Sequence, residues 1–543
     1  MVRDYITDLR QEFQGYGKTK LMKDVLAGLT VTAVALPLAL AFGVSSGADA
    51  AAGLITAIIA GIVIGAFSGA YYQISGPTGA MAAILISVIA NYKLEGVFIA
   101  TLIAGVILVL AGLFHLGTLT LFIPGPVITG FTSGIAIIIA LGQFDSFFGV
   151  HSEGETAIAR LFSYRELGFD PNYSAIGVGL FVVLFMLLFP KKWTRFVPSS
   201  LLSILLTTIV CFAAGIDVET VGEIPKTLIP AGRLHFSDLN LSSMFDLLAP
   251  ALSIALLGMI ESLLCGSSAG RMTGVRLNND RELVAQGIGN ILVPFFGGIP
   301  ATAAIARTSV AIRSGAVTRL TGIVHAVGLL LSMFLLAPFM SRIPLSALAG
   351  VLIVTAWRMN EWDTIHYIFS RRFKGAILKF TATMLATVVF DLVVAILIGV
   401  FIGLVLLVHR LSEIEINYEK VDIERLGIHD EDLTKRYRNA YVVYITGPLI
   451  FANTNSLEQI LKKIPGDCDR LLLSMRGVSH IDVSGAQSLL EMIKIFKESG
   501  GNLLLCGVPN GTMESMRRAG IYDMVGQDRF YWSVERAILD HPH

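Results

Sequence analysis

Two charged side chains lie inside apolar stretches of the sequence, where a charge needs a partner or a function. Glu261 ends the apolar stretch 247–261, and Arg307 lies within the short apolar run 301–313. Ionisable residues inside membrane-length runs are costly, so a function is the default expectation for both. A carboxyl group at position 261 can carry a coupling proton, and Arg307 can attract an anion. A purely structural ion pair between the two residues is the alternative.

Glycine and proline open two of the short apolar runs. The first opens with QISGPTGAM at 73–81, and the second with GGIPATAA at 297–304. Neither run reaches the roughly 20 residues that a membrane-spanning helix needs. In each of them a proline stands before the helical part, where its missing N–H is not required.

These two interrupted runs occupy matching places, because they are the third and the tenth of fourteen apolar runs. A matched pair of short, Gly/Pro-interrupted segments indicates a binding site between inverted repeats. Two helix N-termini that face each other present unpaired N–H groups and positive dipole ends, which favour an anion. Ordinary kinks, which glycine and proline also produce in membrane helices, are the alternative.

The apolar runs recur from Asp24 to about Arg410 and then stop. Asp24 and Asp391 lie at the ends of runs, where we expect solvation at the membrane interface. Gln73 and Gln143 are more typical of hydrogen bonds between helices than of ligands. The runs are 24–44, 49–67, 78–92, 95–113, 119–143, 172–190, 198–214, 246–266, 281–298, 301–313, 317–338, 344–357, 374–391 and 393–409.

The composition indicates a polytopic membrane protein. Of 543 residues, 54% are hydrophobic and 15% are charged, against about 25% charged residues in a typical soluble protein. The formal net charge is zero, whereas nucleic-acid-binding proteins usually carry a basic excess. The four cysteines are scattered, and no catalytic triad, metal-binding motif or phosphate-binding loop is present. We therefore expect neither an enzyme nor a cofactor.

The distribution of Lys and Arg sets the predicted orientation. An even number of spans places both termini on one side, and the loops on that side hold seventeen of the loop Lys and Arg residues. The opposite loops hold six, which are Lys93, Arg160, Arg165, Lys226, Arg233 and Arg342. Positive charge accumulates on the cytoplasmic side. Both termini are therefore predicted to be cytoplasmic, in the inner (plasma) membrane.

The sequence divides into four parts. A cytoplasmic N-terminal segment, 1–23, precedes a transmembrane transport domain, 24–410. A charged segment, 411–436, is expected to be a linker of soluble character. The last part, 437–543, alternates strand-like and helical patterns and predicts a small cytoplasmic α/β domain.

Several motifs together resemble one transporter family. The membrane part contains a first-span motif at 23–43 and the further strings QISGPTGAM, IPGPVITGFTSGIAIII (123–139), VGEIP (221–225), IESLLCGSSAG (260–270) and GGIPATAAIART (297–308). In the C-terminal part, GPLIFAN (447–453) and RGVSHIDVSG (476–485) are similar to a STAS domain, the sulfate-transporter and anti-sigma-factor-antagonist module. The chain is identified as a member of the SulP sulfate-permease family, relatives of the solute-carrier-26 anion transporters.

The resemblance implies a fold of seven plus seven inverted spans. A core domain (spans 1–4 and 8–11) moves against a gate domain (spans 5–7 and 12–14) in an elevator-like manner, and members are commonly homodimers. It assigns Glu261 as the acidic position of the eighth span, with a proton-coupling role. Carried over residue by residue, the substrate site falls on Leu38, Phe42, Thr78, Gly79, Ala80, Ala303, Ala304, Ile305 and Arg307.

The identity of the substrate follows from departures within this pattern. Leu38 stands where many sulfate-type members have glutamine, which makes the pocket wall less polar. Cys265, Ala303 and Ile305 replace smaller or hydroxyl-bearing residues of sodium-coupled bicarbonate members, so oxygen ligands for sodium are lost. Glu261 together with IPATAAIART resembles proton-coupled dicarboxylate members. We expect proton symport of a small, fumarate-like carboxylate, with bicarbonate or sulfate transport, sodium coupling, or uncoupled exchange or conduction as alternatives.

Ser484 in the predicted STAS domain has two interpretations. It aligns with the serine that anti-sigma antagonists present for phosphorylation, which would make it a regulatory phosphosite. The turn Asp482-Val483-Ser484-Gly485 is also an ordinary N-capping arrangement, and we favour this structural interpretation. The domain is expected to serve scaffolding, assembly or regulation, with a cytoplasmic protein as its partner.

Overall fold

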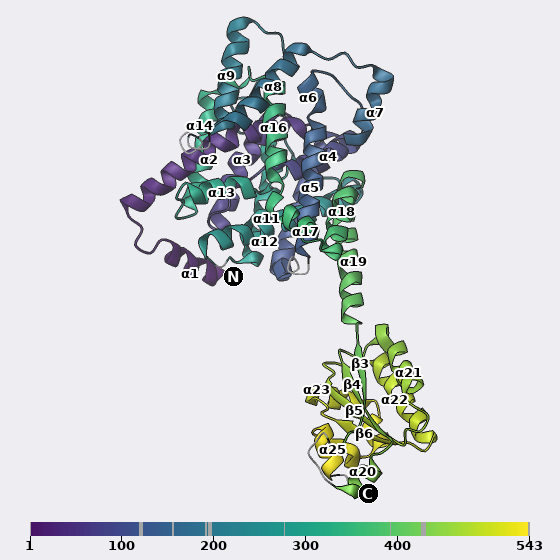
Figure 1. The fold of residues 1–543 in the computed structure, drawn as a ribbon. Coiled ribbons are helices and arrows are strands. Elements are labelled where there is room, and N and C mark those ends of the chain that lie inside the picture. The colour runs from purple at the N-terminus through teal and green to yellow at the C-terminus, as the bar shows by residue number, and fades with distance from the viewer. Residues whose placement is uncertain are drawn as a thin grey trace. The chain divides into compact units, whose positions relative to one another are not determined.

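The fold was analysed in a computed structural model, which divides into two compact units, 1–401 and 402–543 (Figure 1). The helix α19 (Leu392–Leu411) crosses this division. Asp391 lies outside the described residues. The structure describes residues 2–118, 123–154, 157–190, 193, 198–275, 277–390, 392–424 and 430–540.

One group of helices in the first unit packs around a short two-stranded sheet. Glycine allows the closest approaches, because Gly105 and Gly287 face each other across two helices and a Cβ on either would collide with the backbone of the other. The group comprises α2 (Lys18–Ser45), α3 (Ala50–Phe67), β1 (Ser75–Gly76), α4 (Gly79–Leu113), α11 (Leu248–Thr273), α12 (Asn279–Leu292), β2 (Thr302–Ala303), α13 (Ile305–Arg313) and α14 (Leu320–Leu335).

A second group packs mainly within itself. Gly134 lies against Thr387, which brings two of its helices together, and Gly399 of α19 lies against Thr383. The group comprises α5 (Gly125–Gly142), α6 (Phe144–Phe148), α8 (Tyr173–Leu188), α9 (Ser199–Ala214), α16 (Leu345–Met359) and α18 (Lys374–Val389). Apart from the fourteenth span, which is α19, the spans that we assigned to the core and gate domains fall in these two groups, and we use these names for them.

Each of the fourteen predicted runs overlaps a helix. Runs 78–92 and 95–113 both fall in α4, which bends at Lys93, where φ is +59°. Among the described residues, six helices are long and apolar enough to cross a membrane, and four shorter apolar helices accompany them. The number of crossings and the inverted repeat stay predictions.

Shorter elements connect these helices or precede them. They are α1 (Val2–Glu12), α7 (Ala157–Leu167), the 3-10 turn η2 (Phe236–Asp238), α10 (Leu241–Asp246), the 3-10 turn η3 (Val293–Phe296), α15 (Ala337–Met340) and α17 (Trp362–Ser370). Of these, α1 is important for the core domain, because its side chains contact α12 and the start of α14.

The second unit is a five-stranded sheet in the order β3-β4-β5-β6-β7, with only the β3–β4 pair antiparallel. Its strands are β3 (Glu415–Lys420), β4 (Ala440–Thr446), β5 (Arg470–Gly477), β6 (Asn502–Cys506) and β7 (Phe530–Tyr531). Its helices are α20 (Glu431–Arg436), α21 (Thr454–Lys463), α22 (Val483–Glu498), α23 (Asn510–Arg518), α24 (Ile521–Val525) and α25 (Val534–Asp540), with 3-10 turns at Phe451–Asn453 and Gln527–Arg529.

The central parallel strands β5 and β6 are mostly buried on both faces, as parallel strands usually are. Leu471 and Leu473 of β5 point into one apolar cluster, and Leu472 between them points into the other. The expected linker, 411–436, is not a linker throughout, because it contains β3, which pairs with β4 and belongs to the sheet. Its alternating sequence EIEINYEK is that of a half-exposed strand, and its charges concealed this pattern.

Candidate anion-binding site

The two Gly/Pro motifs meet in the core domain as a short antiparallel junction. Ser75 pairs with Ala303, and Gly76 pairs with Thr302. Two residues, Pro77 and Thr78, separate β1 from α4, and one residue, Ala304, separates β2 from α13. Two half-helix N-termini are thus held by one pair of strands, where unsatisfied N–H groups favour an anion.

Thr78 links the start of α4 to Glu261 on α11. Its hydroxyl donates a hydrogen bond to Glu261 Oε2 at 2.8 Å and accepts one from the Met81 N–H at 3.4 Å. Glu261 is half-buried, one residue before the fully buried Ser262. A carboxyl group and a helix N-terminus therefore share one hydroxyl group.

Arg307 is buried behind the junction and does not pair with Glu261. Its side chain is 1% exposed, and its Nη2 donates to the carbonyl of Pro77 at 2.7 Å. The other terminal nitrogen, Nη1, has no hydrogen-bond partner among the described residues, and a Cβ on Gly76 would lie 2.6 Å from it. The guanidinium thus braces the turn before α4, and its charge reaches the site across the backbone of 76–78.

The helix α2 supplies an apolar wall. Leu38 and Phe42, one turn apart, are 6% and 5% exposed. Phe42 lies beside Gly79, where an added Cβ would be 3.1 Å from the Phe42 ring and would collide with Ile139 of α5. Gly79 therefore fits between a core helix and a gate helix.

The start of α13 is more open than the start of α4. Gly79, Ala80 and Ala303 are buried, Ala304 is half-buried, and Ile305 is 45% exposed. The helix α13 has no side-chain cap among the described residues, whereas Thr78 caps α4. Uncapped N–H groups of a first helical turn are free to donate hydrogen bonds to an external acceptor.

Sequence reasoning missed the polar groups that support the junction. Ser262 Oγ lies 2.9 Å from Thr302 Oγ1 and accepts a hydrogen bond from the Ala303 N–H at 3.3 Å. Gln73, expected to bond between helices, donates to the Ser262 carbonyl at 2.5 Å. Thr308 accepts from the Ile74 N–H at 3.0 Å. Hydroxyl residues in apolar runs were the available signal, but spacing alone does not reveal which strands they brace.

Asp24 is not solvated at an interface as we expected. It is fully buried and accepts hydrogen bonds from the Val317 and Thr318 N–H groups and the Thr318, Thr321 and Tyr16 hydroxyls. The pKa of Tyr16 is raised to about 12, because its hydroxyl is shielded from water and bonded to this carboxylate. Asp24 therefore ties α2 to the loop before α14.

Ser484 of the second unit lies in the first turn of α22. Asp482 is the N-cap, and its carboxylate accepts hydrogen bonds from the N–H groups of Gly485 at 2.8 Å and Phe451 at 2.9 Å. Ser484 itself is half-buried. In the described parts of the chain, no group of three or more His, Cys, Asp or Glu side chains is placed to hold a metal ion.

A helical membrane unit with paired half-helices, followed by an α/β domain, is the architecture of a multi-pass membrane transporter with an accessory domain. Residues 21–382 match the model of the sulfate permease family, and residues 433–537 match that of the STAS domain. The chain belongs to the sulfate permease family, as its motifs predicted, and is an anion transporter rather than an enzyme.

Individual relatives agree with this assignment. YvdB of Bacillus subtilis (strain 168), named as a candidate sulfate transporter, is 36% identical over 96% of this chain and 97% of its own length. The transmembrane domain of a cyanobacterial bicarbonate transporter, BicA, is similar with a TM-score of 0.65 and 31% identity, over 71% of this chain and 98% of that domain. The murine Slc26a9 anion transporter shares the fold, with a TM-score of 0.83 and 17% identity, over 97% of this chain and 92% of that one.

Proposed function

We propose that the protein is a secondary active transporter that carries a small anion together with a proton. The observation that supports this most directly is the 2.8 Å hydrogen bond from Thr78 to Glu261. It places the acid beside the N-terminus that would bind the anion, without an ion pair to Arg307.

The proposed coupling is electrostatic. An ionised Glu261 competes with a substrate anion for the positive end of α4. A proton on Glu261 removes this competition, so the proton-bound state binds the anion more tightly. Coupling between two binding sites is reciprocal, so a bound anion also raises the affinity of Glu261 for its proton. The proton and the anion therefore favour the same loaded state and are carried together. The residues proposed for the substrate are Leu38, Phe42, Thr78, Gly79, Ala80, Ala303, Ala304, Ile305 and Arg307.

For the substrate we propose a small carboxylate such as fumarate. The apolar wall of Leu38 and Phe42 suits a carbon skeleton between carboxylate groups, and Phe42 lies beside Gly79 in the first turn of α4. Bicarbonate is the second candidate, favoured by the 31% identity with BicA. Sulfate is the third, since YvdB is named for it.

We further propose that the core domain moves against the gate domain, and that the chain acts as a homodimer in the inner membrane with both termini in the cytoplasm. The ion pairs Asp8–Arg281 and Glu12–Arg319 join the N-terminal segment to two predicted cytoplasmic loops. This supports the proposal that all three lie on the same side of the membrane. Gly79, enclosed between Phe42 and Ile139, lies at the surface along which the domains would slide.

The test is uptake by the purified protein in proteoliposomes under an imposed inward proton gradient. Labelled fumarate is the probe, with bicarbonate, sulfate and chloride as competitors and a sodium gradient as a separate arm. We expect accumulation that a protonophore abolishes. Uptake of bicarbonate without fumarate would favour the second candidate, and accumulation that follows sodium would contradict proton coupling.

A further inference from the structure

A second buried glutamate, Glu282 of α12, has surroundings unlike those of Glu261. Its side chain is 2% exposed. Oε2 accepts hydrogen bonds from the Ser68 hydroxyl at 2.5 Å and the Gly69 N–H at 3.1 Å, and Oε1 accepts one from Gln286 at 2.8 Å. Three donors satisfy the hydrogen-bonding capacity of a carboxyl group that is buried in the protein. Glu282 thus fixes the chain just before β1.

Gln286 continues this contact into the proposed anion site. The same amide nitrogen that bonds Glu282 donates to Ser75 Oγ at 2.9 Å, and Ser75 is the first residue of β1. One helical turn further on, Asn290 donates to the Ala301 carbonyl at 2.9 Å and accepts from the Ala301 N–H at 2.8 Å, just before β2. One polar stripe of α12, at intervals of four residues, therefore supports both strands of the junction.

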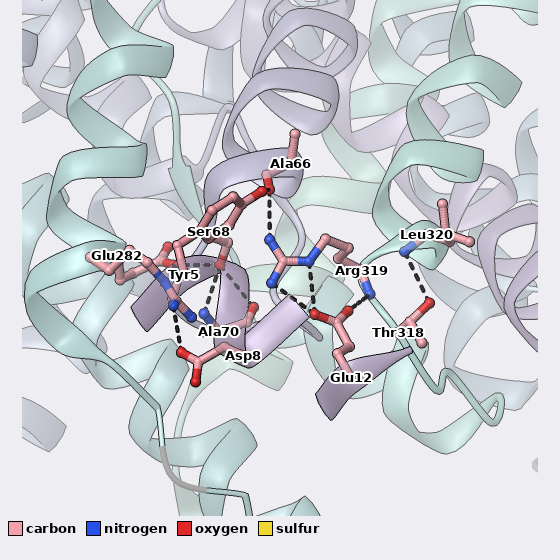
Figure 2. Close-up of polar contacts among 12 residues, drawn as sticks. Tyr5, Asp8, Glu12, Ala66, Ser68, Ala70, Glu282, Thr318, Arg319 and Leu320 are labelled. Carbon is pink, nitrogen blue, oxygen red and sulfur yellow. Dashed lines mark hydrogen bonds and ion pairs between the residues drawn. The ribbon is translucent and has the colours of Figure 1, made fainter. Parts of the chain in front are cut away.

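The N-terminal helix α1 contacts α12 and the start of α14 by two ion pairs, of which the one to α14 is buried (Figure 2). Arg281, next to Glu282, pairs with Asp8 at 2.5 Å. Arg319, at the start of α14, pairs with Glu12 at 2.7 Å, and these two side chains are 4% and 1% exposed. Removing one partner of such a pair leaves an uncompensated buried charge, so the contact strongly favours a docked α1.

Tyr5 completes the attachment at the end of α3. Its hydroxyl donates to the Ala66 carbonyl at 2.7 Å, and the same carbonyl accepts from Arg319 Nη1 at 2.6 Å. The guanidinium groups of Arg281 and Arg319 lie 5.5 and 5.4 Å from the Tyr5 ring centroid. Ala66 is two residues before Ser68, so α1 and Glu282 hold the same short segment from two sides.

We propose that Glu282 and Gln286 are positioning residues of the anion site, and that α1 acts as a clasp that seats the helix carrying them. This inference rests on the proposed anion site at the junction of β1 and β2. The contacts of α1 named above all fall on core-domain elements, so the clasp travels with the core domain. Its expected effect is on anion affinity, through the placement of β1 and Thr78, rather than on proton coupling or the rate of domain movement.

The test compares the half-saturation concentration and the maximal rate of uptake in proteoliposomes. The variants are Glu282→Ala and Gln286→Met, which keeps the length of the side chain but removes both hydrogen bonds. Glu95→Ala, at an exposed glutamate, is the matched control. We expect a rise of about tenfold in half-saturation for Glu282→Ala and a smaller rise for Gln286→Met, with maximal rates within about twofold of the control. A lost maximal rate with unchanged half-saturation would overturn the proposal.

A second measurement needs no transported substrate. Ala303, paired with Ser75, is 2% exposed, so a cysteine placed there by Ala303→Cys reacts slowly with a thiol reagent. Adding Glu282→Ala, or deleting 2–12, should raise its alkylation rate several-fold, whereas Glu95→Ala should not. Unchanged alkylation in all three proteins would refute the clasp. If wild-type protein takes up none of fumarate, bicarbonate or sulfate, the proposed function fails, and the alkylation rates still decide this inference.

Discussion

Two glutamates on neighbouring core helices have different surroundings, and we propose different roles for them, proton exchange for Glu261 and positioning for Glu282. Glu261 is half-buried and has one hydrogen-bond donor, the hydroxyl of Thr78. Glu282 is almost fully buried and has three donors. Moving Glu282 would break three hydrogen bonds, whereas a change at Glu261 affects the one to Thr78. The residue type is the same, and the two proposed roles rest on the different hydrogen-bond partners of the two carboxyl groups.

The sharpest way to break this comparison is to neutralise each acid in turn. We expect Glu261→Gln to abolish accumulation driven by a proton gradient while exchange of the anion continues, because an amide binds no coupling proton. Glu282→Ala should still accumulate substrate, at higher half-saturation. The measurement is the steady-state ratio of labelled anion inside and outside the vesicles, with and without protonophore. Undiminished accumulation by Glu261→Gln would make Glu261 a structural residue.

Arg307 tests whether a buried cation serves the site through the backbone. Arg307→Ala removes the charge and the bond to the Pro77 carbonyl, which we expect to cost about 1.5–3 kcal/mol of anion binding. This corresponds to roughly a tenfold to hundredfold rise in half-saturation. Arg307→Lys keeps the charge but not the planar, forked guanidinium group. Its half-saturation concentration should therefore lie between those of wild type and Arg307→Ala. Unchanged half-saturation in Arg307→Ala, with folding verified by its elution in detergent, would remove this residue from the site.

The residues that the sequence indicated are those whose type is energetically unfavourable in an apolar, helical segment. A charge in an apolar run and a proline before a short run are visible in one dimension, and the structure brings residues 73–81 and 297–304 together at β1 and β2. The resemblance to a family supplied the domain grouping. The helices themselves follow from length and hydropathy, so each expected run overlaps a helix, although two of the runs share α4.

Supporting residues were harder to find, because their roles depend on pairing across long sequence distances. Glu282 and Ser68 are over two hundred positions apart, and Asp24 and Thr318 nearly three hundred. The polar stripe Glu282, Gln286 and Asn290 is visible as a spacing of four, yet the spacing does not say what it faces. Arg307 was expected to reach an anion or Glu261, and only the folded turn shows that it bonds Pro77.

Thr78 donates the hydrogen bond that Glu261 accepts among the described residues, so substituting it tests the comparison of the two glutamates. Thr78→Val keeps the shape but removes both the cap of α4 and the bond to Glu261. We expect anion binding to weaken by about 1 kcal/mol, which corresponds to roughly a fivefold rise in the half-saturation concentration. Thr78→Ser retains the hydroxyl and is the matched control, expected near wild type. Equal uptake by the valine and serine variants would show that the hydroxyl does not link the acid to the helix.

The smallest effect is expected in the second unit, where the capping interpretation and the phosphosite interpretation of the same turn can be separated. Asp482→Ala removes the cap of α22 and should cost about 1 kcal/mol locally, because the Gly485 and Phe451 N–H groups lose their acceptor. Hydrogen–deuterium exchange of the full chain should be faster in the first turn of α22. Ser484→Ala should change neither exchange nor anion uptake, since Asp482 and not Ser484 is the cap. An altered uptake rate in Ser484→Ala, or in Ser484→Asp as a mimic of the phosphorylated state, would instead favour a regulatory role for this serine.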